Sequence, residues 1–83
     1  MIAHGRVQGV YFRDSLRERA RNGGLAGFAR NCADGSMEAA FEGPSRQVEQ
    51  VVAWCADGPE AARVSRLDVI EEEPQGIKGF HVR

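Results

Sequence analysis

Two segments of the chain carry apolar residues at the spacing of one α-helical face. The clearer pattern lies in the second half of the chain, where apolar residues recur at i, i+3, i+4 and i+7: Val48, Val51, Val52 and Cys55. A narrower stripe of apolar residues four positions apart lies in the first half: Phe12, Leu16 and Ala20. The narrower stripe predicts a helix over residues 12–22, ended by Gly23 and Gly24, because glycine readily adopts a left-handed helix cap. The clearer stripe predicts a helix that follows Ser45, a candidate N-cap, and ends at Asp57.

Between and beyond these helices, apolar and polar residues alternate over short stretches, which is typical of strands with one buried face. Met37, Ala39 and Phe41, for example, alternate with two glutamates and an alanine. Asp34 and Gly35 form one of the strongest short hairpin signals, and they separate the second and third predicted strands. The predicted strands cover five ranges: residues 1–6, 25–31, 36–42, 64–70 and 79–83.

The predicted order is β-α-β-β-α-β with a short last strand, which is the order of the ferredoxin-like split-βαβ fold. We expect an α+β sandwich (βαββαβ), with two helices on one face of a mainly antiparallel sheet of four to five strands. In that topology the first and third strands are neighbours at the sheet centre, and the second strand flanks the third. The length predicts a single domain over residues 1–83.

Composition narrows the classes of function. The net charge of −1, from 11 basic and 12 acidic residues, disfavours broad nucleic-acid binding. No apolar run approaches the roughly 20 residues that cross a bilayer, and no secretory leader pattern is present. We therefore expect a cytoplasmic monomer with neither a nucleic-acid nor a membrane partner. Cys32 and Cys55 have no metal-ligand spacing, and Cys55 falls on an apolar helical face, which predicts a buried free thiol.

The loop between the first strand and the first helix combines three groups that bind anions. Gly5 and Gly9 allow close approach of the backbone, and a helix N-terminus presents unpaired N–H groups. Arg13 adds a charged, planar fork that matches phosphate or carboxylate oxygens. The loop lacks the lysine and hydroxyl of the G-x-x-x-x-G-K-[ST] nucleotide signature, and it lacks the third glycine of the dinucleotide fingerprint. A small phosphate-like anion is therefore the expected ligand.

A second polar element lies at the end of the second predicted strand, where Arg30 and Asn31 precede the hairpin turn. An asparagine amide carries both a donor and an acceptor, so Asn31 could hold a water in one orientation without titrating. Because of the predicted strand order, we expect the end of the second strand to meet the loop with Gly5 and Gly9, the glycine loop, at one edge of the sheet.

Three segments together resemble the signature segments of the acylphosphatases: GRVQGVYFR at 5–13, GFARN at 27–31 and DGSME at 34–38. The resemblance covers essentially the whole chain, including Gly43-Pro44 before the second helix and Gly79-Phe80 near the end. It implies a ferredoxin-like sandwich that hydrolyses the carboxyl-phosphate bond of acyl phosphates, an acylphosphatase without a metal or organic cofactor.

The resemblance also implies roles for individual residues. Arg13 matches the phosphate-binding arginine of the family, and Asn31 matches its water-orienting asparagine. The phosphate cradle of the family falls on the backbone of five residues: Gln8, Gly9, Val10, Tyr11 and Phe12. Tyr11 departs from the glycine of many members, so the cradle requires Tyr11 either to keep φ below zero or to tolerate strain.

Other functions are compatible with parts of this pattern. The same cradle could serve a non-catalytic module that binds phosphate, an acyl phosphate or a protein partner. An RNA-binding ferredoxin-like domain is disfavoured by the acidic balance and by the lack of an aromatic pair on a predicted sheet face. The acylphosphatase-like part of a larger carbamoyl-transferring enzyme is disfavoured by the short chain with predicted strands at both ends.

Overall fold

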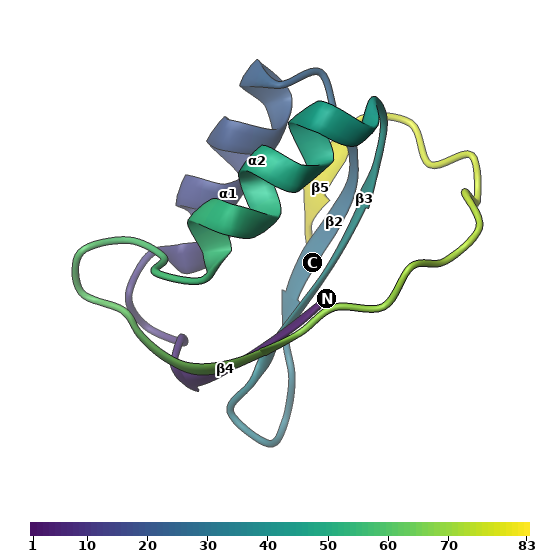
Figure 1. Ribbon diagram of the computed structural model, residues 1–83. Coiled ribbons are helices and arrows are strands. Elements are labelled where there is room, and N and C mark those ends of the chain that lie inside the picture. The colour runs from purple at the N-terminus through teal and green to yellow at the C-terminus, as the bar shows by residue number, and fades with distance from the viewer.

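In the computed structural model, which describes residues 1–83, two helices cover one face of a five-stranded sheet (Figure 1). The elements follow one another along the chain as β1 (Ile2–Arg6), α1 (Phe12–Asn22), β2 (Ala26–Asn31), β3 (Met37–Glu42), α2 (Ser45–Cys55), β4 (Arg63–Asp68) and β5 (Phe80–Val82). This is the predicted β-α-β-β-α-β order with a short last strand. The predicted α+β, ferredoxin-like architecture is therefore confirmed.

The strands lie in the order β4-β1-β3-β2-β5, and every neighbouring pair is antiparallel except the parallel pair of β2 and β5. Met37 of β3 lies opposite Ala3 of β1 on one side and Asn31 of β2 on the other. Because β1 and β2 both run antiparallel to β3, they end at the same edge of the sheet. The loop that follows β1 and the turn that follows β2 are therefore neighbours, as the strand order predicted.

The fourth strand, β4, ends two residues earlier than the alternation of apolar and polar residues predicted. The prediction ran to residue 70, whereas β4 ends at Asp68, and Val69 and Ile70 are 54% and 69% exposed. Asp68 pairs with Ile2, the first residue of β1, so no residue of β1 remains to pair with the two that follow. The segment between β4 and β5 instead bows away from the sheet (Figure 1). There, the Glu42 carboxylate accepts hydrogen bonds from three consecutive backbone N–H groups: those of Gln75, Gly76 and Ile77.

The second helix begins differently from the prediction. Ser45 was the candidate N-cap, but the N-cap is Pro44, and Ser45 is the first helical residue. Pro44 has φ −58° and ψ 133°, and its carbonyl accepts the N–H of Val48 at 3.1 Å. Proline suits this boundary because the helix needs no N–H from it. The first helix ends as predicted, since Gly24 has φ +70° and its N–H donates to the carbonyl of Arg21.

The core lies between the helices and the covered face of the sheet. It contains the predicted stripe of α1 and half of the stripe of α2, together with inward residues of the strands: Phe12, Leu16, Ala20, Val51, Cys55, Ala3, Ala29, Met37, Ala39 and Phe80. Phe12 meets Trp54 edge-on, with ring centroids 5.5 Å apart. Both cysteines are free, and burial raises the pKa of the Cys55 thiol to about 12, so this thiol stays protonated. The predicted buried thiol is confirmed.

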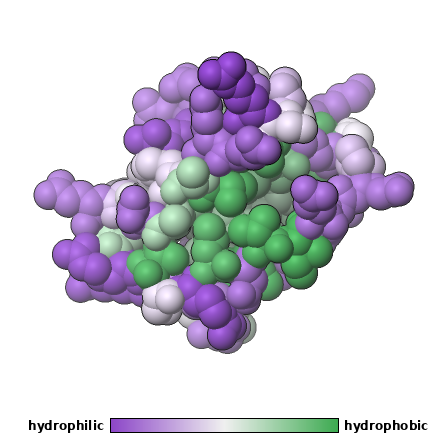
Figure 2. Space-filling view, in the orientation of Figure 1, coloured by the Kyte–Doolittle hydropathy of each residue, from purple (hydrophilic) through white to green (hydrophobic).

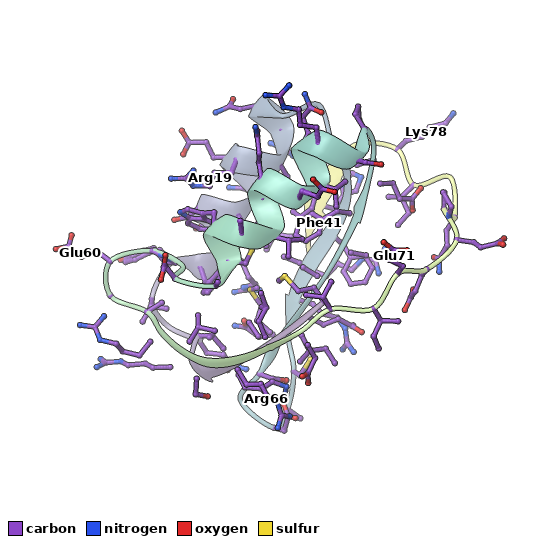
Figure 3. The ribbon with its side chains drawn as sticks, in the orientation of Figure 1. Arg19, Phe41, Glu60, Arg66, Glu71 and Lys78 are labelled. Carbon is purple, nitrogen blue, oxygen red and sulfur yellow. The ribbon has the colours of Figure 1, made fainter.

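Charged side chains lie on the outside of this sandwich. In Figure 3 the side chains of Glu60 and Lys78 point away from the ribbon. The guanidinium of Arg19 instead lies over the ring of Trp54, 4.4 Å from its centroid. Figure 2 shows a group of apolar residues in the middle of the face between α2 and β4, with hydrophilic residues around it. Neither helix has the length and the apolar character that a membrane span requires.

Candidate active site

The loop between β1 and α1 turns its apolar side chains into the core and leaves its backbone N–H groups unpaired. Val7 and Val10 are buried and anchor the loop from below. The first N–H at the start of α1 that bonds to the backbone is that of Ser15, which donates to the carbonyl of Tyr11 at 3.0 Å. None of the backbone N–H groups of residues 8–14 donates a hydrogen bond within the chain. Because such groups carry a partial positive charge, the loop is a concave surface of donors suited to an anion.

Two residues of this loop have positive φ angles, and they turn the backbone toward the helix. Gly9 has φ +72°, and a side chain there would meet no atom within 4 Å, so glycine is needed for its conformation rather than for space. Tyr11 has φ +61° and ψ +25°, and it is the only residue other than glycine with a positive φ. The left-handed region costs an L-residue about 1–2 kcal/mol. The sequence required Tyr11 either to keep a negative φ or to tolerate strain. The structure shows the strained, positive φ.

Arg13 lies in the first turn of α1, beside the unpaired N–H groups. Its Nη1 donates to the backbone oxygen of Arg83 at 2.8 Å, which connects the start of α1 to the chain beyond β5. A cavity of about 340 Å³ brings this residue together with others from the loop and from β2: Val7, Gly9, Tyr11, Phe12, Arg13, Asp14 and Asn31. Asp14 pairs with Arg17 at 3.4 Å, so its charge is partly balanced within α1.

Asn31, the last residue of β2, lines the same cavity as Arg13, as the strand order predicted. Its Oδ1 is buried and has no hydrogen-bond partner in the protein. A buried polar atom without a partner costs about 1–3 kcal/mol, so such atoms are rare and concentrate where a ligand or water completes the bonding. Arg30, the neighbouring residue in the sequence, does not join the site. It is exposed and pairs with Glu38, because successive strand residues face opposite sides.

The side chain of Gln8 connects the loop between β1 and α1 to the turn that follows Asn31. The sequence analysis had assigned a role only to the backbone of Gln8. Its Nε2 donates to the carbonyl of Cys32 at 2.7 Å and to that of Ser36 at 3.0 Å. Both carbonyls belong to the turn that follows Asn31. The signal available in the sequence was a polar residue between buried Val7 and Val10, in a loop expected to lie against this turn.

The turn after Asn31 is also held from within. Oδ1 of Asp34 accepts hydrogen bonds from the backbone N–H and the hydroxyl of Ser36, which is buried. These bonds favour the carboxylate and lower the pKa of Asp34. The turn is therefore held by hydrogen bonds both from within and from Gln8.

The histidines lie outside the cavity. His4 bonds to Asp68 across β1 and β4 at 2.9 Å, and His81 bonds to the carbonyl of Lys78. No group of three or more histidine, cysteine, aspartate or glutamate side chains is placed to hold a metal ion. The ionic group available in the cavity for contact with an anion is thus the guanidinium of Arg13.

The comparisons with known proteins agree on one family. A sequence model of the acylphosphatase family matches residues 1–82. The acylphosphatase of Haloarcula marismortui is 51% identical over 83 residues, which cover 100% of this chain and 91% of that protein. The crystal structure of acylphosphatase from Bacillus subtilis has a TM-score of 0.93 at 31% identity, over 99% of this chain and 92% of that one.

A similar domain also occurs within a much longer protein. The crystal structure of full-length HypF in its phosphate- and nucleotide-bound form matches with a TM-score of 0.88 at 26% identity. The match covers 99% of this chain but 11% of the HypF chain. The family match spans both the glycine loop and the turn with Asn31, and it extends over nearly every residue. The chain therefore belongs to the acylphosphatase family of enzymes.

Proposed function

We propose that this chain hydrolyses the carboxyl-phosphate bond of acyl phosphates in the cavity between the β1–α1 loop and the end of β2. The products are a carboxylate and inorganic phosphate. One observation carries the assignment of the site: the buried, unpartnered Oδ1 of Asn31 shares a cavity with the guanidinium of Arg13 and the unpaired N–H groups of the loop. The family membership supports the reaction class.

The phosphoryl group binds in the loop. The backbone N–H groups of residues 8–12 and the guanidinium of Arg13 contact its oxygens, where negative charge is concentrated. Donors that are already in place need no rearrangement as the charge redistributes in the transition state, and this is the usual source of rate enhancement in phosphoryl transfer. The hydrogen bond from Arg13 to the backbone oxygen of Arg83 supports the guanidinium in this position.

The attacking water is held by Asn31. A water O–H donates to the buried Oδ1, which aims the water oxygen at phosphorus. The new P–O bond forms as the bond between phosphorus and the carboxylate oxygen breaks, and the carboxylate leaves with the bonding electrons. The amide of Asn31 does not titrate, so the proton of the water passes to a phosphoryl oxygen. The departing carboxylate is a weak base, so the reaction requires neither a general acid nor a metal ion.

The test is hydrolysis of benzoyl phosphate in the presence of a metal chelator, with the wild-type chain and two asparagine variants. We expect Asn31→Ala to lower kcat by about 100-fold. Its inhibition constant for inorganic phosphate should stay within about twofold of the wild-type value, because the loop that binds phosphate is intact. Asn22→Ala, at the exposed end of α1, is the matched control and should leave both values unchanged.

Three results would contradict this proposal. Turnover that disappears with the chelator excludes the metal-free reaction. Equal loss of phosphate binding and turnover in Asn31→Ala excludes the division of labour between Asn31 and the loop. Phosphate binding without turnover in the wild type favours the alternative, a non-catalytic phosphate- or acyl-phosphate-binding module.

The proposal extends to the setting in which the chain acts. Its substrate is a small acyl phosphate, and it works as a single-domain cytoplasmic monomer without a nucleic-acid partner. The near-neutral charge balance supports the last point. Size-exclusion chromatography with light scattering, at the concentration of the activity assay, measures the oligomeric state directly.

A further inference from the structure

Tyr11 has two features that the fold does not require. Its backbone is left-handed, with φ +61°, although glycine or asparagine adopts that conformation at lower cost. Its side chain is 79% exposed, so packing in the core does not offset the strain. The next residue, Phe12, shows the opposite behaviour, because its ring is buried against Trp54.

The position of Tyr11 relative to the cavity suggests what the ring does. Three apolar residues line the cavity, and two of them, Val7 and Phe12, are each 1% exposed. Tyr11 therefore supplies nearly all of the apolar surface that a bound molecule could contact there. The remaining lining residues are glycine, charged side chains and Asn31, which bind the phosphoryl group and the water rather than an apolar group.

The geometry of the reaction directs the acyl group toward the exposed part of the cavity, where Tyr11 lies. The phosphoryl group is held by the loop, and an in-line attack requires the acyl group on the side of phosphorus away from the water at Asn31. The acyl group thus leaves the buried end of the cavity, where Asn31 lies, and extends toward its exposed part. An exposed aromatic ring offers such a group an apolar face.

We propose that Tyr11 is a specificity-determining residue, whose ring contacts the acyl group of the substrate. The chain accordingly prefers acyl phosphates with aromatic or extended apolar acyl groups over acetyl phosphate and carbamoyl phosphate. This inference rests on the proposed function of the cavity. It adds the substrate class to the reaction.

The test compares benzoyl phosphate with acetyl phosphate as substrates. The measured quantity is the preference, the ratio of the two kcat/KM values. Tyr11→Asn keeps a residue that tolerates the left-handed backbone but removes the ring, and we expect it to lower the preference about threefold to tenfold. Tyr11→Phe retains the ring and should retain the preference. Ile70→Asn removes another exposed apolar side chain, outside the cavity lining, and it should not change the ratio.

A preference that is unchanged in Tyr11→Asn overturns the inference, as does an equal loss of kcat/KM for both substrates. A second measurement separates this failure from failure of the proposed reaction. Phenacylphosphonate and acetonylphosphonate are stable analogues of benzoyl phosphate and acetyl phosphate that differ in the aromatic group, and calorimetry measures their binding without turnover. Tighter binding of phenacylphosphonate that Tyr11→Asn removes supports the role of the ring, even in a chain that hydrolyses neither substrate. If the chain hydrolyses benzoyl phosphate but Tyr11→Asn changes neither the preference nor the binding of the analogues, the proposed reaction stands. The proposed role of the Tyr11 ring is then wrong.

Discussion

The two helices begin in similar ways in the sequence, but their surroundings differ. Each helix has 11 residues, each follows a glycine-containing connection, and each has an arginine at its second position, Arg13 in α1 and Arg46 in α2. The helices run in opposite directions over the sheet, so they begin at opposite ends of it (Figure 1). The start of α1 faces Asn31 across a cavity. The start of α2 follows Gly43, where an added side chain would meet Leu25 Cδ2 at 2.6 Å.

This difference shows that a helix N-terminus and an adjacent arginine do not make a site by themselves. Both helices present unpaired N–H groups in their first turn, as every α-helix does. The loop before α1 leaves a run of further N–H groups free and lies against the end of another strand. The connection before α2 offers at most the N–H of Gly43, because proline has none. The contrast between Gly43-Pro44, a two-residue connection, and the five residues between β1 and α1 explains why. A two-residue connection that includes proline has too few N–H groups to form a loop that could surround an anion.

The two arginines provide the largest expected contrast. Arg13→Ala should lower kcat/KM for benzoyl phosphate by about 100- to 1,000-fold and weaken inhibition by phosphate, because a charged donor to the phosphoryl group is lost. Arg46→Ala removes an exposed arginine from the equivalent position of α2 and should leave both quantities unchanged. Steady-state kinetics and urea unfolding of both variants check the effect. A similar loss of activity in Arg46→Ala would show that general charge attraction, rather than contact, explains the role of Arg13.

Substitutions at Gly43 and Gly9 should separate an effect on stability from an effect on activity. Gly43→Ala places a side chain against Leu25 at φ +154° and should lower the free energy of unfolding by about 1–3 kcal/mol, with little change in kcat. Gly9→Ala meets no atom within 4 Å, so its cost in stability is only the backbone strain. Its effect on kcat/KM should nevertheless be about tenfold or more, because the N–H groups of the loop turn away from the phosphoryl group. Loss of activity in Gly43→Ala, or none in Gly9→Ala, would contradict the contrast.

Gln8, in the loop before α1, and Gln47, on α2, provide a smaller contrast of the same kind. Gln8→Met leaves the carbonyls of Cys32 and Ser36 without their side-chain donor and should cost about 1–2 kcal/mol of stability. Because this loosens the turn after Asn31, kcat should fall more than phosphate binding. Gln47→Met, on α2, is the control and should change stability by less than about 0.5 kcal/mol. Thermal unfolding together with the ratio of kcat to the phosphate inhibition constant distinguishes the role of Gln8 in positioning from simple destabilisation.

The smallest expected effect is the pH dependence of the turn beside α1. Hydrogen bonds from Ser36 lower the pKa of Asp34 in the folded state. This carboxylate therefore stabilises the fold above its unfolded pKa of about 4, and the contribution is lost as the pH falls from there through the lowered folded pKa. Urea unfolding at pH 7 and pH 3 should show a smaller decrease for Asp34→Asn than for the wild type. The hydrogen bond from His4 likewise lowers the pKa of Asp68, so Asp34→Asn should still show the part of the decrease that comes from Asp68.

Much of the architecture follows from local patterns in the sequence. The spacing of apolar residues predicted both helices, and the bounds of α1 match the prediction at both ends. Gly24 ended α1, and the Asp34-Gly35 turn joined β2 to β3, because steric preferences of single residues act wherever the residue lies. The strand order then placed Asn31 near the loop that leads to Arg13, since strands with the same direction end at the same edge.

The tertiary structure decided what depends on contacts between distant segments. The sequence could not show that Gln8 reaches the turn after Asn31, or that β1 is too short to pair with residues beyond Asp68. It left the backbone of Tyr11 open between two options, because a loop between anchored elements can impose a strained φ that local preference opposes. The sequence by itself thus determined the elements, their order and the residue types at one edge of the sheet. Only the packing of that edge decided which atoms share a cavity, because hydrogen bonds and exposure depend on neighbours far apart in the chain.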